Sequence, residues 1–548
     1  MAWHEATIVN REKVSGKYYN YFNVVGDDGI PNNVNLEKVH YNTVTENEEV
    51  NIVMIPFEEQ STEECKEAKR VELQKLKDFD SYKEVTDVGQ FRISTTWVLW
   101  VKGEETRARL VARGYEEPGN VPSDSPTVEK ANIRLMLTIC QSKGWTVESS
   151  DVKSAFLQGR KLQRKVTLKP PREANVQKGT LWELNVALYG LDDASLQFYF
   201  ECRDRLITLG CKQSEVDPCV FYHYNDNGDL DGILVSHVDD FLHGGSENFK
   251  RNIIEKLRQT FLMGSTESEK FRYVGFDIQQ SEESIVIDQT DFAEEKIEIF
   301  DVGPERAKHS ENNLTDAEKS TLRKVAGKIG WLARGTRPDL AFHQVEISTK
   351  FLNGKVKDLV AASKLVRKVK GSKSKIRIPK LGPFDEWKVE VSTDAALHNL
   401  NEGVDSTGAQ LVLIVDKEGN SAPISWQSNK IKRIVDSTLE AESLSLVEGI
   451  KEGAYVKEMI EEAFNLKANS IRMEAIVDNK STFDAVHSTS AVANKKLRRD
   501  IGRIKQDLNQ GELQKLIWRP GKEQLADAMT KKTAPAHDLL RVFQTGQR

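Results

Sequence analysis

The sequence predicts an α+β protein built from several domains. Helical patterns flank residues 231–243, where apolar residues recur at every second position as in an antiparallel hairpin. Helices mixed with such a hairpin are typical of an α+β fold rather than of a doubly wound sheet. Pro379, Gly382 and Pro383 mark a boundary, and a strand, a hairpin, a long helix and a further strand follow it. The chain of 548 residues exceeds the usual size of one domain, so about three or four domains or subdomains are expected.

The first half of the chain mixes strand and helix patterns. Strands are indicated by short apolar runs between turn residues, and helices by apolar residues three or four positions apart. The elements expected there are short strands within 1–50, a charged helix at 58–78, two strands between 90 and 115 around Gly103, an amphipathic helix at 130–143, helices at 190–210 and 247–262, and strands at 219–223 and 231–243.

The second half is expected to be helical over 318–370 and then α/β. After the boundary come the strand WKVEVST, a hairpin turning over 402–408, the strand APISWQS, a helix over about 438–464 and the strand IRMEAIVD. The tetrapeptide DSTG (405–408) is expected to be this turn. It carries one residue more than the DSG or DTG that an aspartic protease would place between apolar strands.

Composition excludes some classes of protein. Hydrophobic residues make up 39% and charged residues 30%, as in globular proteins. No apolar run approaches a membrane span of ~18 residues, and the N-terminus lacks a secretory pattern. The five cysteines form no CxxC pair, which favours free thiols in a reducing compartment.

Charge is distributed unevenly along the chain. The net charge of -6 counts mildly against a nucleic-acid binder. However, residues 355–380 and 495–505 are rich in Lys and Arg. Each run alone fits a solvated helix face equally well, and phosphate binding is favoured only if catalytic carboxylates lie nearby.

A first group of carboxylates follows apolar alternation. Asp151 ends the strand pattern WTVESSD, and Asp239 and Asp240 lie near the turn of the hairpin GILVSHVDDFLHGG. Adjacent strand residues point to opposite faces, so the turn must redirect one side chain if both are to bind the same ion. Paired carboxylates suit Mg²⁺, and two such ions can activate a 3′-hydroxyl and stabilise a leaving pyrophosphate. An Asp-Asp pair by itself is far more often a simple turn.

A second group of acids lies after the boundary. Asp394 and Asp478 are expected to end strands, Glu442 to lie at the start of the long helix, and Asp527 near the C-terminus. Such positions can converge on one edge of a sheet, where four carboxylates repel one another unless cations neutralise them. Each acid considered alone is more often a surface charge.

The motifs of the first group resemble copia-type retrotransposon reverse transcriptases. DVKSAFLQG, LYGL (188–191) and HVDD (237–240) are similar to their palm motifs, and RARLVARGY (107–115) to their fingers motif. The resemblance implies a right-hand polymerase with fingers, palm and thumb, in which Asp151, Asp239 and Asp240 hold two Mg²⁺ ions, with Mn²⁺ as the alternative. It also implies nucleotide binding by Arg107, Arg113, Phe156 and Tyr189.

Phe156 is implied to be the steric gate that excludes a 2′-hydroxyl, and the alternative is an ordinary core aromatic. Three kinds of position depart from the family. His237 replaces Tyr, Asp192 and Asp193 replace Lys and Gln, and Ser195 replaces Pro. Two carboxylates at these positions, one of them in place of a cation, are expected to weaken the contact between the protein and the phosphates of the template strand.

The motifs of the second group resemble the ribonuclease H domain of the same elements. They read STDAA, ISWQSNK, DSTLEAES, VDNKST, NKKL and ADAMTK, and they imply metal binding and catalysis by Asp394, Glu442, Asp478 and Asp527. Glu440 lies in the same motif. We expect Glu442 to be the ligand because it begins the apolar helix face that continues at Leu446 and Ile450, and we expect Glu440 to be solvated.

A match of TRPDLAF (336–342) to a connecting motif favours binding of the template–primer backbone by residues 355–380. Lys496 stands where the family has a His, which fits binding of the hybrid by residues 495–505. The residues expected to bind are Lys364, Arg367, Lys368, Lys370, Lys495, Lys496, Arg498 and Arg499. The domains implied are a small β module at 1–50, similar to an integrase tail, the reverse transcriptase at 51–300, a connection at 301–384, and a ribonuclease H-like α/β domain at 385–548.

The resemblance implies RNA- and DNA-directed DNA synthesis with cleavage of RNA in RNA–DNA hybrids. The implied partners are an RNA template, a DNA primer (with a tRNA primer as the alternative), hybrids and dNTPs, but no membrane. A monomer or homodimer is expected in the cytoplasm within a virus-like particle, or in the nucleus. The alternatives are a domesticated scaffold that has lost its chemistry and a plain nucleic-acid-binding protein. Neither alternative requires the seven carboxylates that the chain retains.

Overall fold

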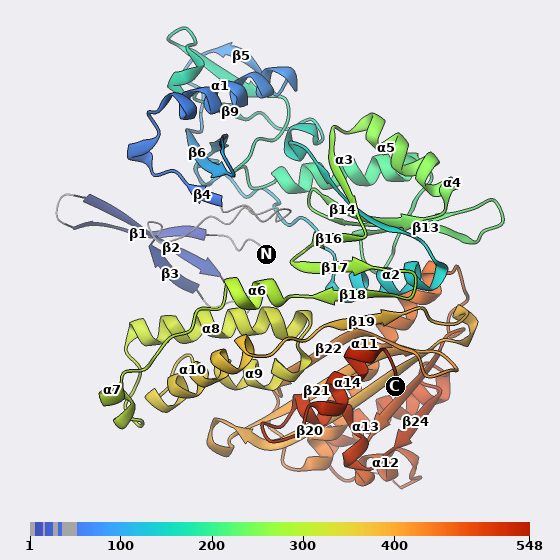
Figure 1. The fold of residues 1–548 in the computed structure, drawn as a ribbon. Helices are drawn as coiled ribbons and strands as arrows, with labels where there is room; N and C mark the ends of the chain where they lie inside the picture. Colours follow the sequence, from blue (N-terminus) through green and yellow to red (C-terminus); the bar gives the residue numbers. More distant parts are fainter. Residues whose placement is uncertain (1–5, 15–16, 26–30, 36–51, 491) are drawn as a thin grey trace.

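The computed structural model describes residues 6–14, 17–25, 31–35, 52–490 and 492–548 (Figure 1). Its first sheet is a three-stranded antiparallel one that lies beside the rest of the chain. Its strands, in spatial order, are β1 (Ala6–Val14), β2 (Lys17–Val25) and β3 (Pro31–Asn35). Short strands within 1–50 are therefore found as expected, and the rest of that stretch lies outside the described residues.

Two small antiparallel sheets and a helix form the next part of the chain. One sheet has the order β4 (Ile52–Met54), β6 (Thr95–Lys102), β7 (Glu105–Ala112), and the other β5 (Tyr82–Thr86), β10 (Thr180–Leu184), β9 (Thr167–Leu168). Helix α1 (Glu63–Asp78) begins at Thr62, whose side chain accepts a hydrogen bond from the Cys65 amide. Leu73 and Leu76 of α1 pack into a core shared with Trp182.

A six-stranded antiparallel sheet, here called the central sheet, includes β13 and β14, which lie at the right of the view in Figure 1 beneath α3 and α5. Its order is β11 (Lys212–Gln213), β12 (Val220–Tyr224), β13 (Leu230–His237), β14 (Asp240–Gly245), β8 (Val147–Val152), β15 (Met263–Ser268). The helices of this part are α2 (Lys130–Lys143), α3 (Ala194–Thr208), α4 (Glu247–Phe249) and α5 (Glu255–Thr260). The predicted hairpin is confirmed as β13 and β14.

A four-stranded sheet and a layer of helices follow. The sheet has the order β16 (Lys270–Tyr273), β17 (Phe276–Gln280), β18 (Ser284–Asp288), β19 (Ile376–Pro379), so it joins segments on both sides of residue 300. The helices are α6 (Thr290–Glu295), α7 (Pro304–Lys308), α8 (Asp316–Gly335), α9 (Ala341–Ser348) and α10 (Val356–Lys370). They pack around a core of their own that includes Leu322, Ile329 and Val366.

The C-terminal part is a mixed five-stranded sheet with helices, coloured orange to red in Figure 1. Its order is β22 (Ser421–Lys430), β21 (Asp405–Val415), β20 (Lys388–Leu400), β23 (Arg472–Val477), β24 (Lys515–Trp518), and β23 runs parallel to both β20 and β24. The helices are α11 (Thr438–Ala463), α12 (Lys480–His487), α13 (Lys495–Gln510) and α14 (His537–Thr545). The predicted α+β class is confirmed.

The expected turn at DSTG was wrong, because residues 405–408 begin strand β21. The chain reverses at residues 401–404 instead. Polar residues can occupy this strand because their side chains bond to β20. The Ser406 hydroxyl accepts a hydrogen bond from the His398 amide at 2.9 Å, and the Thr407 hydroxyl donates to the Asn399 amide oxygen at 2.9 Å.

The C-terminal part packs directly against the central part. The buried Arg134 guanidinium of α2 donates to the Ile424 carbonyl at 2.9 Å and to the Gly335 carbonyl at 3.0 Å, and it lies 3.8 Å from the centre of the Trp426 ring. The Trp426 indole N–H donates to the Ala333 carbonyl at 2.7 Å. Asn132 bonds to the Tyr455 hydroxyl at 2.6 Å. Three parts of the chain thus share one buried junction.

Among the described residues, none of the helices combines the length and the apolar character needed to cross a lipid bilayer.

Candidate active sites

The two hairpin aspartates lie at a tight turn between β13 and β14. Val238 and Asp239 form the turn, and His237 pairs with Asp240 across it. Val238 has φ 58°, a left-handed conformation that is strained for a β-branched residue. The Val152 amide donates to the Asp239 carbonyl at 2.9 Å, which ties the turn to β8. The strained turn thus changes the direction of the backbone between two adjacent carboxylates.

Strand register brings Asp151 beside the hairpin. Asp240 is the direct partner of Asp151 in the antiparallel pair β14 and β8, and directly opposed residues share one face of a sheet. Gly264 of β15 leaves room for the Asp151 carboxylate, since a Cβ atom at residue 264 would lie 2.0 Å from Asp151 Oδ1. We call Asp151, Asp239 and Asp240 the hairpin site.

Burial and mutual repulsion dominate the electrostatics of the hairpin site. Burial raises the pKa of Asp240 well above its usual range, and the charges of Asp239 and Asp151 raise it further. Burial also raises the pKa of Asp239, while the Arg109 guanidinium opposes this effect. Half-buried carboxylates that repel one another in this way favour a bound cation.

Arg109 is a site residue that the sequence analysis missed. Its guanidinium lies 4.0 Å from the centre of the Tyr189 ring, and the Tyr189 and Phe156 ring centres are 5.0 Å apart. Burial raises the pKa of Tyr189 to about 12, so its hydroxyl stays protonated near neutral pH. The predicted residues Phe156 and Tyr189 are therefore neighbours, and the Arg109 guanidinium lies over the Tyr189 ring.

The two predicted arginines lie differently. Arg107 forms an exposed ion pair with Glu105 at 2.7 Å, and Arg113 is exposed just beyond the end of β7. Alternation along β7 was the available signal for Arg109, since residues 107 and 109 share one face of the strand.

Asp193, one of the two carboxylates expected near a template strand, is buried and paired with an arginine. It is 1% exposed, and its carboxylate accepts hydrogen bonds from Arg164 at 2.5 and 2.8 Å. Arg164 also pairs with Glu117. The expected loss of phosphate contact stays a prediction, and the Arg164 guanidinium, which Asp193 shares with Glu117, offsets part of the charge.

The register of the parallel strands brings two of the C-terminal acids together. Pairing of β20 with β23 ends at Ser392 and Ile476, and Asp394 and Asp478 each lie two residues further along. Asp394 was expected to end its strand, which was wrong, because β20 continues to Leu400 along β21. Only the parallel partner stops there, and this leaves the Asp394 carboxylate beside Asp478.

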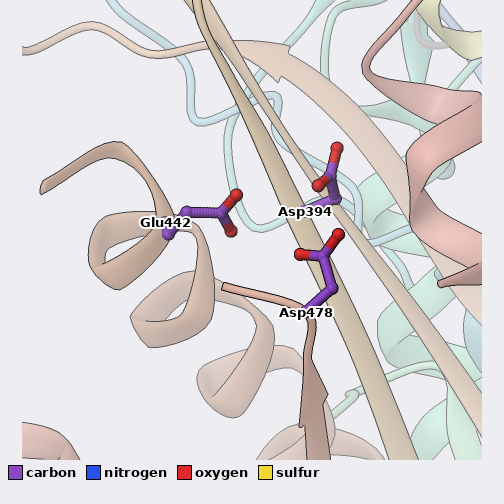
Figure 2. Close-up of side chains that lie close together, drawn as sticks. All are labelled: Asp394, Glu442 and Asp478. Carbon is purple, nitrogen blue, oxygen red and sulfur yellow. The ribbon is translucent and has the colours of Figure 1, made fainter. Parts of the chain in front are cut away.

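Helix α11 supplies the third carboxylate. The Ser445 hydroxyl bonds to the carbonyls of Asp394 at 2.9 Å and Ala409 at 3.1 Å, which fixes the helix over the sheet. Gly449 allows close packing, because a Cβ atom there would lie 2.3 Å from Thr393 Cγ2. Glu442 lies one turn before Ser445 on the same face of the helix. Figure 2 shows its carboxylate directed toward Asp394 and Asp478.

We call Asp394, Glu442 and Asp478 the carboxylate cluster. One ligand oxygen from each lies within 4.8 Å of the others, and among the described residues no other three acidic, His or Cys side chains are gathered so closely. The carboxylates of the hairpin site are thus more widely spaced than those of this cluster.

The chemistry of the carboxylate cluster fits a hard divalent cation. Asp394 Oδ1 and Glu442 Oε2 are buried without a hydrogen-bond partner among the described residues. Burial raises the pKa of Glu442 to about 9 and that of Asp394 to about 6, and the neighbouring acids contribute to both shifts. A bound cation with oxygen ligands would satisfy these unpaired atoms.

Asp527 lies just outside the carboxylate cluster, in a 3₁₀ turn over Leu525–Met529. The Gln524 side chain anchors this turn by donating to the Thr393 carbonyl at 2.9 Å. Lys531 forms an ion pair with Asp527 and lies 3.5 Å from Asp394 Oδ2, and the Thr530 hydroxyl also donates to that carboxylate. Lys531 and Thr530 were missed, although both belong to the ADAMTK motif.

Glu440 is not solvated as expected, because it is 1% exposed. Its carboxylate accepts a hydrogen bond from the Asp436 amide at 3.1 Å and lies 3.6 Å from the Arg433 guanidinium. Glu440 is thus a buried, partnered group that lies outside the carboxylate cluster.

Some basic side chains of residues 355–380 and 495–505 already have partners within the protein. Arg367 pairs with Asp301, and Arg498 donates to the carbonyls of Val492 and Ala493. The predicted binding residues without a partner among the described residues are Lys364, Lys368, Lys370, Lys495, Lys496 and Arg499. A nucleic-acid surface would thus use α10 and the first turns of α13.

Comparison with known sequences adds to this geometry. Residues 81–310 match the sequence model of the reverse transcriptase (RNA-dependent DNA polymerase) family. This stretch is similar in sequence to the reverse transcriptase family. It contains the whole hairpin site, together with Arg109, Phe156 and Tyr189.

Relatives extend the similarity beyond the reverse transcriptase stretch. The retrovirus-related Pol polyprotein from transposon RE1 of Arabidopsis thaliana is 25% identical over 449 residues, which cover 78% of this chain and 29% of that protein. The corresponding polyprotein from transposon TNT 1-94 of Nicotiana tabacum is 27% identical over 432 residues, which cover 72% of this chain and 31% of that protein. The chain thus spans less than a third of these relatives. The predicted relationship to copia-type Pol proteins is confirmed.

Solved structures align with this chain over different lengths. A foamy viral protease-reverse transcriptase in complex with double-stranded DNA covers 97% of the chain, with 11% identity and a TM-score of 0.47. RNase H1 from Halobacterium salinarum NRC-1 covers 28%, with 17% identity and a TM-score of 0.20. The family match and the C-terminal sheet order confirm the predicted fold, an α+β polymerase with a ribonuclease H-like domain.

Proposed function

We propose that the chain synthesises DNA on RNA and DNA templates and cleaves the RNA strand of RNA–DNA hybrids. The observation that carries this proposal is the presence of two separate groups of carboxylates, one half-buried and the other mostly buried. One lies on the central sheet within the reverse transcriptase stretch, and the other lies on the C-terminal sheet.

For synthesis, the hairpin site would bind the metal ions, and neighbouring side chains would bind the nucleotide. Asp151, Asp239 and Asp240 would hold Mg²⁺ (or Mn²⁺), which when bound stabilises the charge that develops during nucleotidyl transfer. Arg109, over the Tyr189 ring, would bind the triphosphate together with Arg107 and Arg113, because guanidinium groups match phosphate geometry. Phe156, against Tyr189, would lie beneath the sugar of the nucleotide.

For cleavage, Asp394, Glu442 and Asp478 would hold divalent cations, with Asp527 as a further ligand. The bound cations would supply an activated water and stabilise the scissile phosphate. Thr530 would orient Asp394 through its hydroxyl. Exposed lysines of α10 and α13 would contact the phosphate backbone of the hybrid.

The proposed partners are an RNA template, a primer of DNA or tRNA, hybrids and dNTPs. We propose a monomer or homodimer, located in cytoplasmic virus-like particles or in the nucleus, and the relationship to transposon polyproteins is consistent with these locations. The proposed domains remain a β module at 1–50, the polymerase at 51–300, a connection at 301–384 and the nuclease at 385–548.

Activity assays test this function. The purified chain with Mg²⁺, poly(rA)–oligo(dT) and labelled dTTP is expected to extend the primer, and with a labelled hybrid it is expected to cut the RNA. Chelation by EDTA should stop both reactions, because both sites use divalent cations. Tight hybrid binding with neither reaction, in either Mg²⁺ or Mn²⁺, would support the scaffold alternative instead.

Selection of the sugar is expected to depend on Phe156. Phe156→Val should raise ribonucleotide incorporation relative to deoxynucleotides by roughly 10-fold or more, since the smaller side chain leaves room for a 2′-hydroxyl. Single-nucleotide insertion kinetics with dTTP and UTP measure the ratio. Phe200→Val, another half-buried aromatic, serves as the matched control. An active Phe156→Val enzyme with unchanged discrimination would assign Phe156 to the core.

A further inference from the structure

Lys531 occupies an unusual position beside the carboxylate cluster. It extends from the segment that follows Asp527, and it forms ion pairs with Asp527 and with Asp394 at 3.5 Å. Its side chain is 41% exposed, whereas that of Asp394 is 1% exposed. The Lys531 side chain is therefore partly in contact with solvent, while its ammonium group contacts the buried carboxylate of Asp394.

The geometry points to Lys531 as an internal counterion that competes with divalent cations for the carboxylate cluster. This inference rests on the proposed nuclease function. We propose that Lys531 is a positioning residue: it holds Asp394 and Asp527 together before metal binding and gives up these contacts when a cation enters.

The argument begins with repulsion. Three ligand oxygens within 4.8 Å of one another, with Asp527 nearby, form a concentration of negative charge that must be compensated. Lys531 and the Thr530 hydroxyl are the groups that contact Asp394 Oδ2. They leave Asp394 Oδ1 and Glu442 Oε2 without partners, so compensation by the protein alone is incomplete.

Competition follows from the position of the ammonium charge. A divalent cation bound by Asp394 and Asp527 would share these carboxylates with Lys531, and two cations at short range repel each other. Lys531 should therefore weaken metal binding while it stabilises the metal-free protein. A residue with a merely structural role would have the opposite effect on affinity, because its loss would disorder the ligands.

The chain supplies a matched control in the next residue. Lys532 carries the same charge, and its side chain is 54% exposed. It pairs with Glu346 of α9 at 3.0 Å instead of with the carboxylate cluster. A change common to both lysine variants would reflect net charge, and a change confined to Lys531 would reflect its contacts.

The test is calorimetric titration of Mg²⁺ into the full chain carrying Asp239→Asn and Asp240→Asn, which remove ligands from the hairpin site. The heat that Asp394→Asn eliminates defines binding at the carboxylate cluster. Lys531→Met is expected to bind Mg²⁺ roughly 5-fold more tightly than the parent, and Lys532→Met should match the parent. Lys531→Arg, which keeps the charge, should restore the parent affinity.

Thermal unfolding supplies an independent measurement. In EDTA, Lys531→Met should melt at a lower temperature than Lys532→Met, and saturating Mg²⁺ should close this gap. Equal or weaker Mg²⁺ binding by a folded Lys531→Met variant would overturn the counterion role while leaving the nuclease proposal in place. Absence of any Mg²⁺ heat that depends on Asp394 would overturn both.

Discussion

Glu442→Gln is expected to reduce cleavage of the RNA strand of a hybrid by roughly 100-fold or more. Glu442 contributes a buried oxygen to the carboxylate cluster, and loss of a metal ligand removes several kcal/mol of stabilisation from the transition state. Single-turnover cleavage of a labelled RNA–DNA hybrid measures the effect, with primer extension by the same preparation as the test of folding.

Glu440→Gln is the matched control for Glu442→Gln. The two residues lie two positions apart on α11 and therefore point about 200° apart around the helix axis. Glu440 bonds to the Asp436 amide and faces Arg433, so its neutralisation should cost about 1 kcal/mol of stability with little change in cleavage. A large loss for Glu440→Gln with near-normal Glu442→Gln would reverse the assignment.

Asp240→Asn is expected to abolish primer extension while leaving hybrid cleavage largely intact. Asp240 directly opposes Asp151 on the central sheet, and the carboxylate cluster lies on a different sheet. Primer extension with dTTP and hybrid cleavage are measured on one preparation. Asp239→Asn should behave in the same way, because its carboxylate belongs to the hairpin site.

Thermal unfolding separates loss of chemistry from loss of folding in these variants. Because burial and repulsion raise the pKa of Asp240, removing its charge should not lower the melting temperature in EDTA. Asp226→Asn, in an exposed turn of the same sheet, should leave both activities unchanged. Loss of both activities in a folded, hybrid-binding Asp240→Asn variant would contradict the assignment of separate sites.

Local patterns predicted the elements well because their signals lie within short segments. The hairpin of β13 and β14 follows from apolar alternation around two turn residues, and α2 was expected over residues 130–143 as it is found. The position of Glu440 also had a local signal. The spacing of Ser437 and Glu440 is that of a capping box, which holds a Glu against the start of a helix.

Long-range contacts could not be read from the sequence in the same way. The pairing of Asp240 with Asp151 joins strands far apart in the chain, and so does the contact of Lys531 with Asp394. The partner of Asp193 was equally hidden, because Arg164 lies 29 residues away in the chain and outside the motifs identified. Such contacts depend on strand order and helix packing, which no local pattern specifies.

The junction around Arg134 has a consequence for any duplex that engages both sites. Because Arg134, Trp426 and Tyr455 join the central and C-terminal parts without an intervening flexible linker, the separation of the two sites does not vary with linker motion. The distance between the two sites is then fixed by the packing of the two parts. With the proposed activities, each nucleotide added would advance the hybrid by one step past the nuclease, so the distance between synthesis and cutting would be set by the shape of the protein rather than by the base sequence.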